Sequence, residues 1–356
     1  MSDFENARRA KILSLFQPTG LGLEVGPSYA PFLPKKDGFN VETVDYADAE
    51  KLRAKYPEKA SIIEDVDYVS DGRSLVDLIG QTQRYDFIYA SHVIEHVTDF
   101  ITFISDCENL LKPGGALVLV VPDKRFCFDA FRPVSTVGDI LQSRLDRRER
   151  HPPGLVYDFI ATYAQRNGSG IWSETNLEGV SLTNSPMSAH ETFLEMSKST
   201  QYVDVHAWRF TPASFRYAVK TLRALGCFRS GIAAIEENPN GSPYKFEFYI
   251  KLTKTAPLDE ESDIALLKAT FSDLEQITVA ANSAPQLQQE VADLSAKNEI
   301  LRAAISKSNE EKQAFEKEAA HLSRLVSDMR QSTSWRITSP VRKIKNFYFS
   351  FLGIRQ

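Results

Sequence analysis

The sequence predicts an α/β fold, in which a doubly wound parallel sheet carries a long insertion and is followed by an α-helical coiled coil. Short apolar runs alternate with helical stretches over residues 22–121, and the first strands end in turns that contain glycine or an acidic residue. Heptad spacing of apolar residues begins after residue 285. Strands that alternate with helices build a parallel sheet, which binds its ligand at the carboxyl ends of the strands.

The first two strands carry the clearest binding signal. The first begins at residue 22 and ends abruptly in a turn of Gly26, Pro27 and Ser28. A backbone that turns so tightly brings its amides against a nucleotide-like ligand. The second strand, residues 41–44, ends on Asp45, and a carboxylate at a strand tip can hold two ribose hydroxyls.

The alternation continues toward the middle of the chain. The expected elements are a helix at residues 48–56, a strand at 64–69, a helix at 74–79, a strand at 85–90 closed by Ser91 and His92, a helix at 98–111 and a strand at 116–121. Residues 112–115, Lys-Pro-Gly-Gly, stop the last of these helices and turn the chain into the strand.

Residues 123–206 interrupt this pattern with a polar insertion that is too long for a simple loop. A helix then starts at Thr211 and Pro212, and strands at 230–235 and 245–254 predict a closing antiparallel hairpin. We therefore expect a first domain at residues 1–254, with the insertion covering the ligand-binding edge of its sheet.

The remaining residues predict three further segments. Residues 255–284 are expected to be a helical linker, and residues 285–331 a coiled coil, because apolar positions follow alternating spacings of four and three. Asn298 falls at an a position, where a buried amide fixes the register of a parallel dimer. One amphipathic helix packed on the first domain is the alternative.

Residues 332–356 form a basic, aromatic tail. Each basic side chain near an anionic membrane contributes on the order of 1 kcal/mol, and Trp335, Phe347, Phe349 and Phe351 can insert shallowly. The tail predicts docking on a membrane surface or on a partner protein.

Composition excludes several classes of protein. The net charge of -5 argues against a nucleic-acid partner, since phosphate backbones favour a strongly basic face. Cys107, Cys127 and Cys227 lack metal-type spacing, and no signal-peptide pattern opens the chain, so a cytoplasmic protein is expected. No stretch reaches the roughly 18 apolar residues of a spanning helix.

The ordered motifs at residues 23–27, 44–46, 71–72, 85–97 and 110–115 resemble those of class I S-adenosylmethionine-dependent methyltransferases. The resemblance implies a Rossmann-like methyltransferase sheet with S-adenosylmethionine as cofactor. It implies these cofactor contacts: Glu24, Gly26, Pro27, Ser28 and Ser91 around the methionine part and the turn, Asp45 on the ribose, Asp71 on the adenine amino group, and Tyr46 and Gly72 beside the adenine. The usual Gly-x-Gly-x-Gly turn is here Glu-x-Gly-Pro-Ser, which leaves one glycine.

The tail resembles one found at the ends of bacterial glycosyltransferases and polysaccharide-modifying enzymes. With the heptad segment, it implies O-methylation of a sugar hydroxyl or terminal phosphate of a bacterial surface polysaccharide. Expected partners are a glycan or sugar-phosphate acceptor, further copies of the chain, a glycosyltransferase and the inner membrane surface. A small-molecule or lipid methyltransferase is the alternative within this chemistry, and a non-catalytic scaffold that recruits glycosyltransferases is the alternative from another class.

Methyl transfer requires alignment of donor and acceptor and removal of the acceptor proton, so few catalytic groups are needed. The candidates are His92 at the pocket floor and His151, His190 and His206 as bases. The insertion adds a basic cluster, which either grips an anionic acceptor through guanidinium forks or forms a solvated helical face: Arg147, Arg148 and Arg150.

Residues 92–96 also spell the His-x-x-Glu-His pattern of a class of zinc peptidases. That interpretation conflicts with the context, because the run straddles a strand end, whereas a peptidase needs a helix and a third ligand. Glu95 and His96 holding a magnesium ion, as in some similar O-methyltransferases, is an alternative. The favoured expectation is a site without metal.

Overall fold

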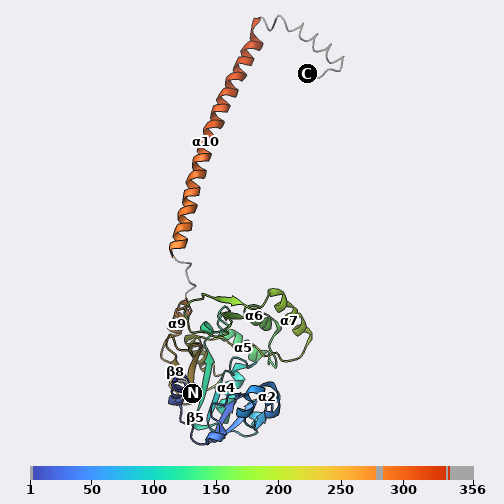
Figure 1. The fold of residues 1–356 in the computed structure, drawn as a ribbon, viewed down its shortest axis with the longest axis vertical. Coiled ribbons are helices and arrows are strands. Elements are labelled where there is room, and N and C mark those ends of the chain that lie inside the picture. Colours follow the sequence, from blue (N-terminus) through green and yellow to red (C-terminus); the bar gives the residue numbers. More distant parts are fainter. Residues whose placement is uncertain (1–2, 278–283, 334–335, 337–356) are drawn as a thin grey trace. The chain divides into compact units, whose positions relative to one another are not determined.

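The computed structural model describes residues 3–277, 284–333 and 336. The chain divides into two compact units, Met1–Ala280 and Ala281–Gln356 (Figure 1). The first unit contains a seven-stranded sheet in the order β3-β2-β1-β4-β5-β9-β8. Its strands are β1 Gly22–Val25, β2 Val41–Asp45, β3 Tyr68–Val69, β4 Tyr85–Ser91, β5 Leu111–Pro122, β8 Gly231–Glu237 and β9 Glu247–Thr253.

The pairing confirms a doubly wound sheet closed by an antiparallel hairpin. Strands β3, β2, β1, β4 and β5 run parallel, and β9 is antiparallel to both β5 and β8. The chain reverses its order between β1 and β4, so the carboxyl ends of these two strands form the topological switch point where ligands bind.

The third strand is shorter than the sequence predicts. The expected strand began at residue 64, but only two residues of β3 pair with β2. The side chain of Asp67 accepts from the amide nitrogen of Thr43 at 2.7 Å, which takes the place of a backbone ladder bond. Because the Thr43 amide already has a hydrogen-bond partner, it does not need a backbone carbonyl from a longer β3 strand.

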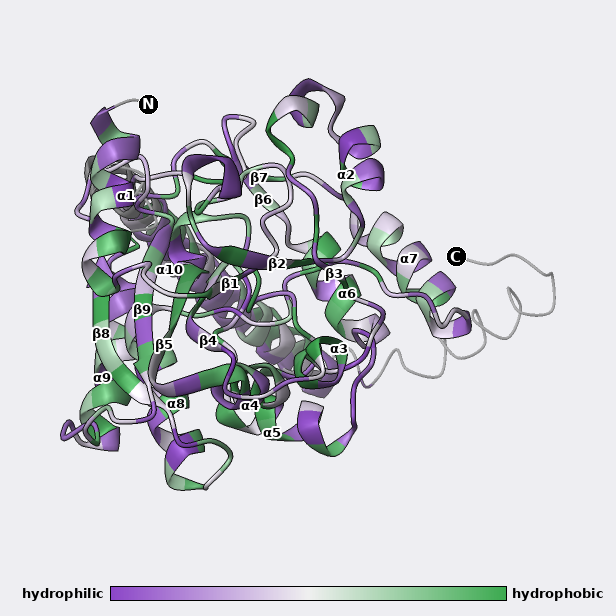
Figure 2. Cartoon of the chain, turned by 90° about the horizontal axis from the view of Figure 1, so that it is seen from below, coloured by the Kyte–Doolittle hydropathy of each residue, from purple (hydrophilic) through white to green (hydrophobic). Residues whose placement is uncertain are grey.

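Helices cover both faces of the sheet. They are α1 Asp3–Leu15, α2 Ala49–Lys55, α3 Leu75–Ile79, α4 Phe100–Leu110 and α8 Pro212–Ala224. One apolar cluster packs α4 and α8 against one face, and a second packs α1 against the other. The hydrophobic colour runs along β5 and much of α4 in Figure 2, as burial on both faces of a parallel sheet requires.

Helix starts follow their sequence signals. Thr211 precedes Pro212 and forms a capping box with Ser214, and Asp99 accepts from the amide of Thr102 at the start of α4. These caps satisfy amides that have no partner within the helix.

The insertion is folded. It contains α5 Val137–Leu145, α6 Pro153–Ala161, β6 Ala164–Arg166, β7 Val180–Leu182 and α7 Pro186–Lys198. Its last segment returns to the carboxyl end of β4, where the amide of Ala207 donates to the carbonyl of Glu95 at 2.6 Å and the Trp208 indole donates to the Val97 carbonyl at 2.7 Å. The insertion therefore borders the ligand-binding edge of the sheet.

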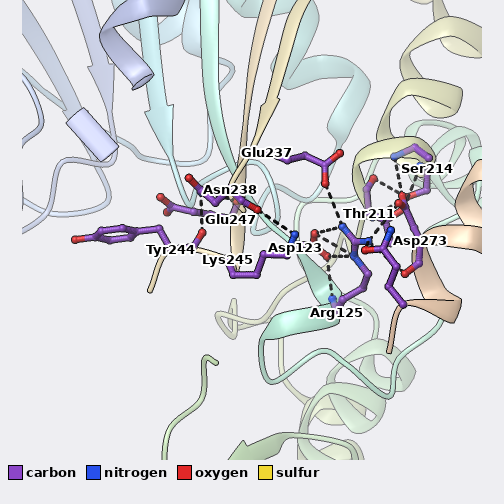
Figure 3. Close-up of polar contacts among 12 residues, drawn as sticks. Asp123, Arg125, Thr211, Ser214, Glu237, Asn238, Tyr244, Lys245, Glu247 and Asp273 are labelled. Carbon is purple, nitrogen blue, oxygen red and sulfur yellow. Dashed lines mark hydrogen bonds and ion pairs between the residues drawn. The ribbon is translucent and has the colours of Figure 1, made fainter. Parts of the chain in front are cut away.

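Residues 255–284 are not simply a linker, because they contain helix α9, Asp263–Glu275, which packs on α8 within the first unit. The guanidinium of Arg125 is fully buried and binds Asp123 in a forked pair, and its Nη1 lies 3.2 Å from Oδ1 of Asp273 on α9 (Figure 3). The other Asp273 oxygen accepts from the amide of Ala213 in the first turn of α8. The first unit thus extends to Ala280, beyond the expected boundary at residue 254.

The second unit contains α10, Ala284–Gln331, a helix of 48 residues. Its side chains from residue 295 onward are exposed, including apolar residues of the heptad seam: Leu301, Ile305, Phe315, Leu322, Val326 and Met329. The helix agrees with the sequence, and the coiled coil stays a prediction. The tail at residues 332–356 lies outside the described residues except for 332, 333 and 336. Within the described ranges, no helix is both long and apolar enough to cross a bilayer.

Replacing Asp273 by alanine should lower the free energy of unfolding by about 2 kcal/mol, because a fully buried guanidinium and an amide of α8 both lose an acceptor. Asp263→Ala is the matched control on the same helix, since Asp263 is 64% exposed in its pair with Lys220, and should cost under about 1 kcal/mol. Urea unfolding of both variants measures the difference. Equal losses would show that α9 does not stabilise the first unit.

Candidate active site

A cavity of about 630 Å³ opens at the carboxyl ends of β1 and β4, at the switch point of the sheet. Its size suits a nucleoside-containing ligand. The lining includes Glu24, Gly26, Pro27, Ser28, Tyr29, Tyr56, Ser91, His92, His96 and Tyr244. The structure thus brings together five residues that the resemblance implied as cofactor contacts, from Glu24 to Ser91.

The turn after β1 requires glycine at its first position. Gly26 has a φ of 69°, and a Cβ there would lie 2.7 Å from a methyl of Val93. Asp45 fixes the turn from behind, because its carboxylate accepts from the amide of Ser28 at 2.7 Å and from that of Tyr46 at 2.8 Å. Each Asp45 oxygen keeps acceptor capacity for a ligand hydroxyl. Burial raises the pKa of this carboxyl, and the two amides oppose the rise.

Glu24 is a buried carboxyl in the wall of the cavity. It accepts from the amides of Phe32 and Leu33 at 2.6 and 3.0 Å. Burial outweighs these bonds and raises the pKa of Glu24 to about 7. A carboxyl with this pKa ionises readily when a cationic ligand arrives, and the sulfonium of S-adenosylmethionine is such a ligand.

The implied adenine contacts lie outside the cavity lining. Asp71 is exposed and pairs with Arg73 at 2.8 Å, and Gly72 is exposed beside it. Tyr46 is 55% exposed, with the Lys55 ammonium 4.7 Å from its ring centre. Their roles therefore remain expectations from the resemblance.

Two lining tyrosines were not among the expected site residues. The rings of Tyr29 and Tyr56 lie 4.7 Å apart. Tyr29 follows the glycine turn directly, which is a signal that the sequence does contain. Tyr56 ends α2, and only the folded chain brings it to the cavity.

Of the four histidines that the sequence offered as catalytic candidates, only His92 is among the residues that line the cavity. Its Nε2 lies 2.9 Å from Oε2 of Glu247, and although burial opposes the shift, the hydrogen bond to Glu247 and the nearby Glu95 carboxylate raise the pKa of His92 to about 9. His151 is buried beside Tyr202, and burial lowers its pKa to about 4. His190 is exposed on α7 and stacks on a neighbouring phenylalanine.

The three arginines of the insertion do not point to one common site. Arg147 is exposed, and Arg148 pairs with Asp146 at 3.0 Å. Arg150 donates to the carbonyls of Met196 and Ser199 at the end of α7. The hypothesis that these arginines grip an anionic acceptor together gains no support, because Arg148 and Arg150 already hold protein groups.

Residues 6–182 match the family model described as a methyltransferase domain. The parallel sheet, the glycine turn and the acidic strand tips agree with this match. The chain therefore carries a class I S-adenosylmethionine-dependent methyltransferase domain.

The chain is also similar to curated methyltransferases. A ubiquinone biosynthesis O-methyltransferase of Rhodopseudomonas palustris is 30% identical over 122 residues, covering 34% of this chain and 45% of that protein. One of Nitrobacter winogradskyi is 27% identical over 174 residues, covering 48% and 63%. The matches thus span less than two thirds of these relatives. A solved S-adenosylmethionine dependent methyltransferase of Mesorhizobium loti has a TM-score of 0.36 at 13% identity, covering 68% of this chain and 95% of that one.

Asp45→Ala should weaken S-adenosylmethionine binding about 100-fold, because the ribose contact and the anchor of the Ser28 amide, together about 3 kcal/mol, are lost at once. Titration calorimetry measures the affinity. Asp48→Ala is the control, since it removes the same charge three residues away at an exposed helix cap and should leave the affinity within about twofold. An unchanged affinity in Asp45→Ala would exclude a ribose contact.

Affinity for S-adenosylmethionine should fall roughly tenfold from pH 8 to pH 6, because binding the sulfonium favours ionised Glu24, whose pKa in the free protein is raised to about 7. Glu24→Gln should bind more weakly at pH 8 and lose this pH dependence.

The same raised pKa makes the free protein less stable as the pH rises from 4.5 to about 7, because the folded state then holds the proton more tightly than the unfolded chain. An unaltered pH profile in Glu24→Gln would assign the titration to another group.

Proposed function

We propose that this protein transfers the methyl group of S-adenosylmethionine to a hydroxyl oxygen of a small-molecule acceptor. The observation that carries the proposal is the cavity at the switch point, which is lined by the glycine turn and the buried carboxyl of Glu24. The buried carboxyl of Asp45, at the end of the adjacent strand, holds that turn through the amide of Ser28. The curated relatives are named as O-methyltransferases of ubiquinone biosynthesis, which supports oxygen as the methylated atom.

The chemistry needs little from the protein besides alignment. The acceptor hydroxyl gives its proton to water, its oxygen forms a bond to the methyl carbon, and the carbon–sulfur bond breaks with its electron pair staying on sulfur. The products are the methyl ether and S-adenosylhomocysteine. Holding both reactants in line supplies most of the acceleration.

The lining of the cavity favours a ring-containing acceptor. Tyr244, from the loop before β9, and His92 and His96, after β4, line the cavity. Aromatic side chains give a flat apolar contact for another ring, and the histidines give polar contacts for a hydroxyl. The acceptor is therefore expected on this side of the cavity.

A surface polysaccharide is the second candidate acceptor. The observation that favours it is the second unit, because α10 lies outside the matched methyltransferase region and its tail has the sequence pattern of glycan-modifying enzymes. In that case α10 would associate with further copies of the chain, and the tail would contact a glycosyltransferase or the inner membrane surface. If the protein is instead a non-catalytic scaffold, it should bind the cofactor but transfer no methyl group.

Transfer of a labelled methyl group separates these functions. The full chain is incubated with labelled S-adenosylmethionine and either a dihydroxybenzene or a purified surface glycan, with Asp45→Ala as the inactive control. We expect label in the dihydroxybenzene. Label in the glycan alone would favour the polysaccharide, and cofactor binding without transfer to either would favour the scaffold.

A further inference from the structure

A cluster of metal-type ligands lies beside the cavity. It consists of Glu95 and His96, just after β4, and His206, at the end of the insertion. One donor atom from each lies within 4.8 Å of the others. His96 also lines the cavity, so the cluster borders the space that the substrates would occupy.

The carboxylate of Glu95 is the unusual member. It is 1% exposed, and among the described residues neither of its oxygens has a hydrogen-bond partner. A buried carboxylate without a partner is costly, because it has lost its water without gaining an equivalent contact. The nearest nitrogens surround Oε1 at separations that are too long for hydrogen bonds, namely His92 Nδ1 at 3.5 Å, His96 Nε2 at 3.8 Å and His206 Nε2 at 3.9 Å.

Two histidines are oriented as metal ligands are. The Nδ1 of His206 lies 2.5 Å from Oδ2 of Asp129, and the Nδ1 of His96 lies 2.8 Å from Oδ1 of Asp204. The contact of His206 is a hydrogen bond, whereas that of His96 is a close approach without hydrogen-bond geometry. In both histidines Nε2 lies within 4 Å of Oε1 of Glu95. A carboxylate–histidine hydrogen bond such as that of Asp129 and His206 fixes the tautomer and ring orientation of metal-binding histidines.

The backbone holds the two halves of the cluster in register. The carbonyl of Glu95 accepts from the amides of Ala207 and Trp208, which directly follow His206. Arg132 is buried and binds the other oxygen of Asp129 at 2.8 Å, which fixes the carboxylate behind His206. Backbone hydrogen bonds and a buried ion pair therefore fix where the metal-binding atoms of this cluster lie.

We propose that Glu95, His96 and His206 bind a zinc-type divalent ion, whereas the sequence favoured a site without metal and offered magnesium on Glu95 and His96 only as an alternative. Tetrahedral bonds of about 2.0 Å separate ligand atoms by about 3.3 Å. The observed 3.8 and 3.9 Å therefore need to contract by about half an ångström, and all three donor atoms already lie within 4.8 Å of one another. Two imidazoles and one carboxylate suit zinc, whereas magnesium prefers a shell of oxygens. Three protein ligands leave a fourth position open.

This ion has a role if the proposed function holds. An acceptor hydroxyl at the open position would bind the ion through oxygen and release its proton to water more readily, as zinc-bound water does. The oxygen then attacks the methyl carbon and the carbon–sulfur bond breaks, as described above. The ion neither gains nor loses electrons.

Metal analysis of the full chain tests the site without reference to catalysis. After chelator removal and reconstitution with zinc, we expect about one ion per chain by elemental analysis after gel filtration. Cobalt in place of zinc should give the strong visible absorption of a four-coordinate nitrogen and oxygen site. Less than about 0.1 ion per chain and no such absorption would overturn the proposal.

Variants assign the ligands. Glu95→Gln and His206→Gln should each lower zinc affinity by at least about 100-fold, and Asp129→Asn, which acts through His206, by about 10- to 100-fold. His190→Ala, an exposed histidine of the same unit, should leave the metal content unchanged. If the Asp129 variant does not fold, the cobalt spectrum of the parent still decides. Retention of the parent spectrum in both ligand variants would contradict the assignment.

The two proposals fail separately. Zinc bound without methyl transfer to any acceptor would leave the site standing and remove the proposed function. Methyl transfer at full rate by metal-free protein, with no ion bound on reconstitution, would leave the function standing and overturn the site.

Discussion

The geometry of the site depends on the contacts that the carboxylate of Glu247 makes. It lies at the start of β9 and is buried, and it binds Arg8 of α1, His92 at the end of β4 and the hydroxyl of Tyr249. Although burial opposes the shift, the bonds from His92 and Arg8 lower the pKa of Glu247 to about 2. One ionised group therefore joins the N-terminal helix, the closing hairpin and the strand whose carboxyl end borders the cavity.

Around that contact the chain builds the cavity from segments far apart in sequence. The glycine turn comes from the first strand, the histidines from the fourth, and Tyr244 from the loop before β9. The insertion returns to the same edge through backbone bonds to Glu95, which brings His206 and Asp129 against the residues after β4. The glycine-turn side of the cavity depends on segments that follow one another in the chain, whereas the surroundings of Glu95 depend on how the insertion folds back.

Much of the sheet could be predicted from the sequence, because strand periodicity and turn residues are local signals. The turn at Gly26, the acid at Asp45 and the cap at Thr211 each reflect a requirement of their own segment. The site's less local features could not be predicted in this way. The partners of Arg150 and the burial of Glu95 are set by contacts with α7 and with residues 206–208, which no spacing reveals. Helix α9 looked like a linker because its buried contact, Asp273 with Arg125, joins residues at a long separation.

The short β3 strand has a consequence for how copies of this protein can meet. Because the Asp67 side chain occupies the Thr43 amide, one border of the sheet offers only two residues of open ladder. At the opposite border, β8 is irregular between Ile232 and Ala234, and such bulges discourage a foreign strand from adding on. Both borders are thus poor templates for the addition of a strand from another copy of the chain.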